Sequence, residues 1–256
     1  MPVFAMGDFS ERVGGALVTG GSGGIGAAIC EMLAERGSSV AFTYRSNADS
    51  AESVAAAVRS TGVSAHFGNP ALEDADEVRA FADEAADRLG GLHTVVSAAG
   101  PHVPQMYVSQ ADPALFARQI DADVLGAFNL TRAVLPHLRS AGGSIVYVTT
   151  AATTVFPKRD ALSSIPKGAV ESLMRAVAAE EGRFGVRANC VGPGMLEDGM
   201  AARLMADGDL DDRALEVARA NIPLGRFGKA TDIAEAACFL ASGAANYISG
   251  QKLDID

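Results

Sequence analysis

Glycines at three spaced positions give the chain a backbone that could hold a phosphate. Gly20, Gly24 and Gly26 follow the apolar run 16–18 and lead into a helical pattern over 27–34. Glycine lets the backbone adopt positive φ and approach a ligand closely, and the free N–H groups at a helix start attract an anion. The order strand, tight turn, helix therefore predicts a dinucleotide pyrophosphate site. Its predicted contacts are Gly20, Ser22, Gly23, Gly24, Ile25 and Gly26.

The next strand pattern carries the second candidate contact. Glycines alone could merely connect a strand to a helix, but a strand over 39–44 follows at the distance that a βαβ unit requires. A site specific for NAD usually has a carboxylate at the end of this strand, close to the adenosine ribose. Arg45 and Ser46 stand there instead, and both can bind a 2′-phosphate. The sequence therefore favours NADP, with NAD possible, although Arg45 could also be an ordinary exposed charge.

Strand and helix patterns alternate along the remainder of the chain. Apolar runs such as 94–96 and 145–148 are continuous, which is typical of parallel strands covered on both faces. They predict an α/β fold with a doubly wound parallel sheet, in a single Rossmann-type domain over 1–256. A helical insertion at about 195–221 could be a lid over substrate or could pack as an ordinary amphipathic segment. The other predicted elements are helices over 48–60, 73–89, 112–139, 164–184 and 230–241, and strands over 63–67, 92–97, 143–149, 186–191 and 252–255.

Composition excludes several classes of partner. With 256 residues, 48% of them hydrophobic, the chain can bury one large core. A net charge of −10 without a basic run argues against nucleic acid and anionic membranes. No stretch has the pattern of a signal peptide or membrane span, so we expect a cytoplasmic protein with a small-molecule ligand. Three widely spaced cysteines argue against a disulfide framework or metal site and are interpreted as core residues: Cys30, Cys190 and Cys238.

The segment Thr19-Gly20-x-x-x-Gly24-Ile25-Gly26 resembles the phosphate loop of the short-chain dehydrogenase/reductase family, and the resemblance extends over nearly the whole chain. It implies further cofactor contacts. Asn69 stands where the family usually has an aspartate near the adenine, and Ser97 to Gly100 resemble its Asn-Asn-Ala-Gly segment. A Pro-Gly turn in the family lies beside the nicotinamide. The positions implied are Asn69, Ala98, Ala99, Gly100, Lys167, Pro193 and Gly194.

The resemblance also locates the catalytic positions, three of which differ from the family pattern of Asn, Ser, Tyr and Lys. Lys167 matches the family lysine, and Ser163 stands four residues before it, where the tyrosine belongs. Thr150 occupies the serine position and Asp123 the asparagine position. Threonine keeps a hydroxyl that can donate to an oxyanion. Serine is a much weaker acid than a phenol and reaches less far, so we expect Ser163 to cap the helix before Pro166.

Asp123 with a retained lysine and no tyrosine is similar to peroxisomal-type 2,4-dienoyl-CoA reductases, which reduce a conjugated thioester. Two interpretations remain open. In the first, the protein reduces a carbonyl or conjugated enoyl group of a small or thioester-linked substrate, and Asp123 moves a proton to carbon. In the second, Asp123 and Lys167 form a buried ion pair in a catalytically degenerate, nucleotide-binding sensor or assembly partner.

The surroundings of the site give two further expectations. The loop after 100 places His102 and Tyr107 as candidate substrate contacts or as plain loop packing. The family usually pairs its two long helices between subunits, here 112–139 and 164–184. These helices carry more apolar residues than one face needs to pack against the sheet of its own chain. We therefore expect a homotetramer.

Overall fold

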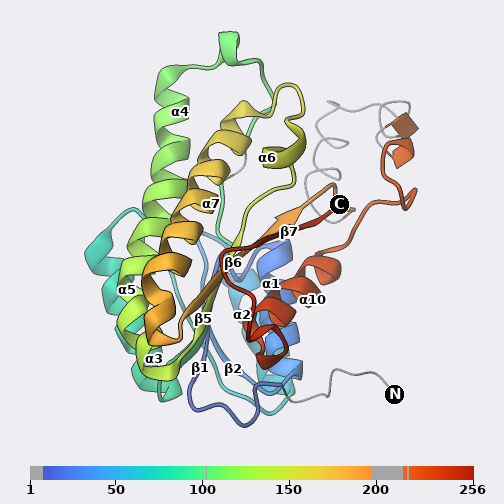
Figure 1. Cartoon of the computed structure of the whole chain (residues 1–256). Helices are drawn as coiled ribbons and strands as arrows, with labels where there is room; N and C mark the ends of the chain where they lie inside the picture. Colours follow the sequence, from blue (N-terminus) through green and yellow to red (C-terminus); the bar gives the residue numbers. More distant parts are fainter. Residues whose placement is uncertain (1–7, 102, 198–215, 218) are drawn as a thin grey trace.

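Seven parallel strands form one sheet whose order reverses direction at its centre. Figure 1 shows this sheet between two layers of helices. The computed structural model describes residues 8–101, 103–197, 216–217 and 219–256. The order β3-β2-β1-β4-β5-β6-β7 means that the chain runs outward from β1 and then outward again from β4. Ligands of such sheets bind beyond the carboxyl ends of the strands at this switch point. The strands are β1 Gly15–Thr19, β2 Ser39–Thr43, β3 Ala65–Gly68, β4 Leu92–Ser97, β5 Ser144–Val148, β6 Arg187–Pro193 and β7 Lys252–Ile255.

Helices cover both faces of the sheet, which explains why the strands are continuously apolar. Successive side chains of a strand point to opposite faces. Val18 accordingly packs with α1, α2 and α10, whereas Leu17 packs with α3, α5 and α7. The predicted doubly wound fold is confirmed. The helices are α1 Gly24–Glu35, α2 Ala48–Ser60, α3 Ala75–Leu89, α4 Pro113–Ile120, α5 Gly126–Ala141, α6 Ala152–Val155, α7 Ala161–Glu181 and α10 Ala230–Ala241.

Local signals fix several helix ends. The Asp74 carboxylate accepts from the N–H groups of Asp76 and Glu77 at 2.9 and 3.1 Å, which caps α3. Gly90 ends the same helix with φ +76°, a conformation that suits glycine. Asn47 caps α2 by accepting from the Ser50 N–H. These elements therefore begin and end close to where the sequence pattern placed them.

The helix predicted over 112–139 is interrupted at the site. α4 and α5 are joined by a π-helical turn, Asp121–Leu125, which contains Asp123. Such turns leave the i→i−4 ladder locally and are frequent at functional sites. The periodicity of the sequence did not reveal this turn, nor the short helix α6.

The start of the lysine helix corrects a prediction. α7 begins at Ala161 rather than 164, and its N-cap is Asp160, so Ser163 is not a capping residue. Ser163 lies inside the first turn, where its own N–H donates to the Asp160 carbonyl at 3.0 Å. Pro166 lies within the helix rather than at its first position. The tertiary position of Asp160 in the preceding loop extends the helix by a turn.

The insertion predicted at about 195–221 lies mostly outside the described residues, as does His102. Its described beginning, Leu196, forms an isolated parallel bridge with Gly228, which leads into α10. Among the described residues, no helix combines the length and apolar character needed to cross a bilayer.

Candidate active site

The predicted phosphate turn folds so closely that side chains would not fit. Gly20 has φ +71°, and a Cβ atom there would lie 2.8 Å from the Ala99 Cα. A Cβ atom on Gly26 would collide with the carbonyl oxygen of Gly20. Both glycines are therefore required by the close approach of backbone to backbone at the switch point.

Two hydroxyl residues that the sequence did not single out hold this turn. The Thr43 hydroxyl accepts from the Gly20 N–H at 3.1 Å, and its carbonyl accepts from Gly21 at 2.8 Å. The Ser50 hydroxyl donates to the Ser22 carbonyl at 3.0 Å. The sequence feature that could have identified Thr43 is its place at the carboxyl end of β2, the strand that follows the phosphate turn in the chain.

The start of α1 fits the phosphates of a dinucleotide. Its N-cap, Gly23, makes no side-chain cap, and its first turn holds no acidic residue, so the N–H groups of Gly24 and Ile25 remain available to an anion. Arg45 and Ser46 follow β2 and are exposed, and Asn69 is exposed after β3. The residues present therefore suit a nicotinamide dinucleotide, with the donors for its phosphates along one edge of the sheet.

The end of β4 connects this turn with the catalytic positions. Ala98 and Ala99 donate from their N–H groups to the carbonyl and hydroxyl of Thr19, at 3.2 and 3.3 Å. The next residue, Gly100, lies against the lysine: a Cβ atom there would be 3.2 Å from Lys167 Nζ and 3.5 Å from Asp123 Oδ1. The structure thus brings Gly20, Ala99 and Gly100 together with the predicted catalytic pair.

Lys167 and Asp123 form a buried ion pair. Nζ of Lys167 donates to Oδ1 of Asp123 at 2.7 Å. The lysine side chain is 15% exposed and the aspartate side chain only 1%. The second carboxylate oxygen, Oδ2, has no hydrogen-bond partner among the described residues. A buried, unpartnered acceptor is costly unless a ligand or water meets it.

Thr150 lies two residues after the end of β5. Its hydroxyl accepts from the Ala152 N–H at 3.1 Å, which leaves its own proton free to donate. The N–H of Ala151 donates to the Pro193 carbonyl at 3.0 Å, and Gly194 donates to Ile255 at 2.8 Å. The predicted Pro193–Gly194 turn is therefore joined to the Thr150 segment. Pro193 itself is the last residue of β6, not part of a loop beyond it.

The loop after β4 and the loop before α7 are joined by hydrogen bonds. The Gln105 amide donates to the Asp160 carboxylate at 3.0 Å, and the Arg159 guanidinium donates to the Gln105 carbonyl at 2.9 Å. Burial raises the pKa of Asp160, and the bond from Gln105 opposes that rise. Tyr107, a predicted substrate contact, is 51% exposed on the same loop.

Comparisons with known proteins agree with this geometry. Residues 20–256 match the family model described as enoyl-(acyl carrier protein) reductase. The chain belongs to the short-chain dehydrogenase/reductase family. It is 36% identical over 249 residues to a cis-4-hydroxycyclohexanecarboxylate dehydrogenase of Sinomonas cyclohexanicum, covering 97% of this chain and 96% of that one.

Two solved structures extend the comparison. A short-chain dehydrogenase of Burkholderia cenocepacia in complex with NADP is 29% identical, with a TM-score of 0.86 over 96% of this chain and 98% of that one. An NAD⁺-bound xylitol dehydrogenase is 24% identical, with a TM-score of 0.89 over 95% and 98%, and shows the shared fold alone. The protein is thus an oxidoreductase of the short-chain family, which uses NAD or NADP.

Position 163, where the family motif has a tyrosine, is a serine, and the described tyrosines come from other segments of the chain. Tyr147 is fully buried in β5, where its hydroxyl and that of Thr131 are 2.7 Å apart, and burial raises its pKa. Tyr44 and Tyr247 lie on other parts of the molecule, at the end of β2 and after α10. Ser163 is 9% exposed.

Proposed function

We propose that this short-chain oxidoreductase prefers NADP and reduces a carbonyl or conjugated enoyl group of a small or thioester-linked substrate. The observation that carries the proposal is the buried Lys167–Asp123 pair against Gly100, with one carboxylate oxygen left without a partner. The enoyl-reductase description of the family model supports the enoyl substrate, and the Sinomonas relative supports a carbonyl formed from a ring alcohol.

The cofactor contacts follow from the turn and the strand ends. The N–H groups at Gly24, Ile25 and Gly26 would hold the pyrophosphate, and Arg45 with Ser46 would hold the 2′-phosphate. Ala98, Ala99 and the Pro193–Gly194 turn would border the nicotinamide and its ribose, and Asn69 the adenine. When bound, the reduced nicotinamide supplies the hydride.

Three side chains then do the remaining work. In our proposal the Thr150 hydroxyl and the Lys167 ammonium donate to the substrate oxygen, on which negative charge develops. In an enoyl reduction Asp123 takes a proton from solvent and passes it to carbon, through Oδ2 and either directly or through one water. Ser163 has a minor role, because an aliphatic hydroxyl does not replace the acidity or the reach of a phenol.

A substrate panel with NADPH tests the reaction. It should contain 4-oxocyclohexanecarboxylate, acetoacetyl-CoA, crotonyl-CoA and 2,4-hexadienoyl-CoA, with loss of NADPH absorbance as the readout. With the best substrate, Lys167→Ala and Asp123→Ala should each lower kcat by about a hundredfold or more, the scale of losing a general acid. Ser163→Ala should change kcat little, and all three variants should still bind NADPH.

A second candidate function is dinucleotide binding without catalysis, as a sensor or assembly partner. The observation that favours it is that Lys167 Nζ already pairs with Asp123 Oδ1 at 2.7 Å, as in a structural ion pair. No turnover of any panel member, together with an Asp123→Asn variant that keeps cofactor binding, would support this candidate and contradict the catalytic one.

The cofactor preference has a separate test. NADPH should bind more tightly than NADH in a fluorescence titration, because no acid stands at the end of β2. Arg45→Ala should weaken NADPH binding by roughly tenfold to a hundredfold, the scale of a charged hydrogen bond, and leave NADH unchanged. Arg59→Ala is the matched control, since Arg59 is an exposed arginine at the far end of α2 that pairs with Glu52. Equal affinities for the two cofactors would remove Arg45 from the site.

We also propose a single domain in which the insertion at about 195–221 covers the substrate, and a homotetramer. Exposed apolar side chains support assembly: Leu125 of the π-helical turn, Phe128 of α5 and Ile165 of α7 are 40, 46 and 50% exposed. Burying such residues against a second copy removes apolar surface from water. Light scattering should report four chains, and a monomer would contradict the assembly.

A further inference from the structure

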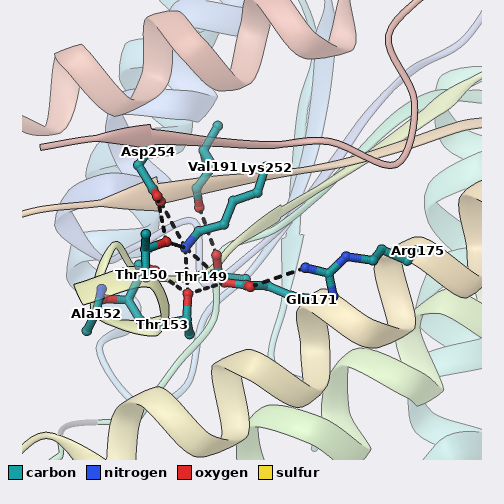
Figure 2. A network of polar contacts seen from close by, with 10 residues as sticks. Thr149, Thr150, Ala152, Thr153, Glu171, Arg175, Val191, Lys252 and Asp254 are labelled. Carbon is teal, nitrogen blue, oxygen red and sulfur yellow. Dashed lines mark hydrogen bonds and ion pairs between the residues drawn. The ribbon is translucent and has the colours of Figure 1, made fainter. Parts of the chain in front are cut away.

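Lys252 is a buried lysine outside the predicted site. Its side chain, which comes from β7, is 11% exposed. Nζ lies 3.2 Å from Glu171 Oε1 and 2.9 Å from Asp254 Oδ1. It also donates to the hydroxyls of Thr153 and Thr154, at 2.5 and 3.1 Å. Figure 2 shows this ammonium between Asp254, Thr153 and Glu171, side chains that come from β7, α6 and α7.

The network ends on the backbone of Thr150. The Thr153 hydroxyl lies 2.6 Å from Glu171 Oε1 and 3.1 Å from the Thr150 carbonyl oxygen, and Lys252 donates to the same hydroxyl. A hydroxyl has one proton, so Glu171 and Thr150 compete for it. Lys252 offsets the charge of Glu171, the stronger of the two acceptors, and so leaves the Thr153 proton more available to the Thr150 carbonyl.

The same lysine also packs against the end of β6. A Cβ atom on Gly192 would lie 2.7 Å from Lys252 Cε and would overlap a carboxylate oxygen of Asp254. Gly192 immediately precedes the Pro193–Gly194 turn. The Lys252–Asp254 pair therefore packs against the end of β6 and also contacts α6, the helix that follows Thr150.

We infer that Lys252 is a positioning residue for Thr150: it holds the first turn of α6, through Thr153 and Glu171, so that the Thr150 hydroxyl points at the substrate oxygen. This inference rests on the proposed function. Without the lysine charge, Thr153 donates to Glu171 alone and the Thr150 carbonyl loses its partner. The first turn of α6 then moves, and the Thr150 hydroxyl moves with it because it accepts a hydrogen bond from the Ala152 N–H.

A double-mutant cycle tests the inference. Lys252→Met keeps most of the stem and removes the charge, and Thr150→Ala removes the hydroxyl. With the best panel substrate, Lys252→Met should lower kcat by about tenfold or more, as misplaced groups do, and leave the Kd for NADPH unchanged. In the Thr150→Ala background it should lower kcat by less than about twofold, because coupled residues are not additive.

Hydrogen exchange gives a readout independent of activity. In the unliganded Lys252→Met protein, exchange should rise in the segment 150–155 and stay unchanged in 39–43. Thr153→Val, which keeps the volume and removes the hydroxyl, should reproduce both results should Lys252→Met fail to fold. Lys158→Met is the matched control, since Lys158 is exposed on the loop after α6, and it should match the wild type.

The outcomes separate the two proposals. An unchanged kcat in Thr150→Ala overturns the role of Thr150 and the positioning inference together. A lowered kcat in Thr150→Ala with a normal kcat in Lys252→Met overturns the inference alone. Equal effects of Lys252→Met in both backgrounds, or exchange raised throughout the chain, show a general structural role and also overturn it.

Discussion

Removing Lys167 from the Lys167–Asp123 pair should lower the free energy of unfolding far more than removing the charge of Asp123. The aspartate side chain is 1% exposed and its Oδ2 has no described partner, whereas the lysine side chain is 15% exposed. Lys167→Met therefore leaves a buried carboxylate without its cation, which costs about 3–5 kcal/mol of unfolding free energy. Asp123→Asn leaves Lys167 an amide oxygen as acceptor and some access to water, so we expect a cost of about 1 kcal/mol.

Urea unfolding of the unliganded protein at pH 7 and fixed concentration measures both costs. For a chain of this size, the Lys167→Met loss corresponds to a fall in Tm of roughly 6–20 °C. The double variant, which carries neither charge, should be more stable than Lys167→Met alone. A larger loss in Asp123→Asn than in Lys167→Met would refute the reasoning, because the carboxylate would then not be the more poorly compensated charge.

Two further predictions concern buried groups away from the site. Burial lowers the pKa of His93 to about 4 from 6.5, so the folded protein holds it neutral while the unfolded chain protonates it. The neutral imidazole therefore contributes fully to the free energy of unfolding above pH 6.5. This contribution, about 3 kcal/mol in all, is lost as the pH falls from 6.5 toward 4. Urea unfolding should show this loss in the wild type but not in His93→Phe, and a parallel pH dependence in both would contradict it. Burial raises the pKa of Cys190 and Cys238 to about 12, so thiol reagents should label neither at pH 8 until urea is added, and rapid labelling of the native protein would disprove their core placement.

The fold could be predicted because its signals are local. Continuous apolar runs gave the strands, and apolar residues at helical spacing gave the helices between them. The three cysteines, predicted as core residues, are indeed buried. The prediction for Ser163 was wrong for a tertiary reason. The amide of Gln105, 55 residues away in the sequence, donates to the Asp160 carboxylate, and Asp160 is the N-cap of α7. Serine before a proline is a helix-start signal, but a distant contact overrode it.

The residues of the site likewise differ in whether a local sequence signal identifies them. Residues that a ligand or the backbone geometry requires, such as Gly20 and Gly26, stand in a recognisable spacing. Residues that position them reach across the sequence: Thr43 binds the turn at Gly20 from a neighbouring strand, and Lys252 is nearly a hundred residues from Thr153. Their partners are set by the strand order, which brings β2 beside β1 and β7 beside β6. A lysine in a short final strand has no spacing signal of its own. Only the registers of the sheet, which align it with Cys190 of β6 and Cys190 with Tyr147 of β5, bring it level with the end of β5.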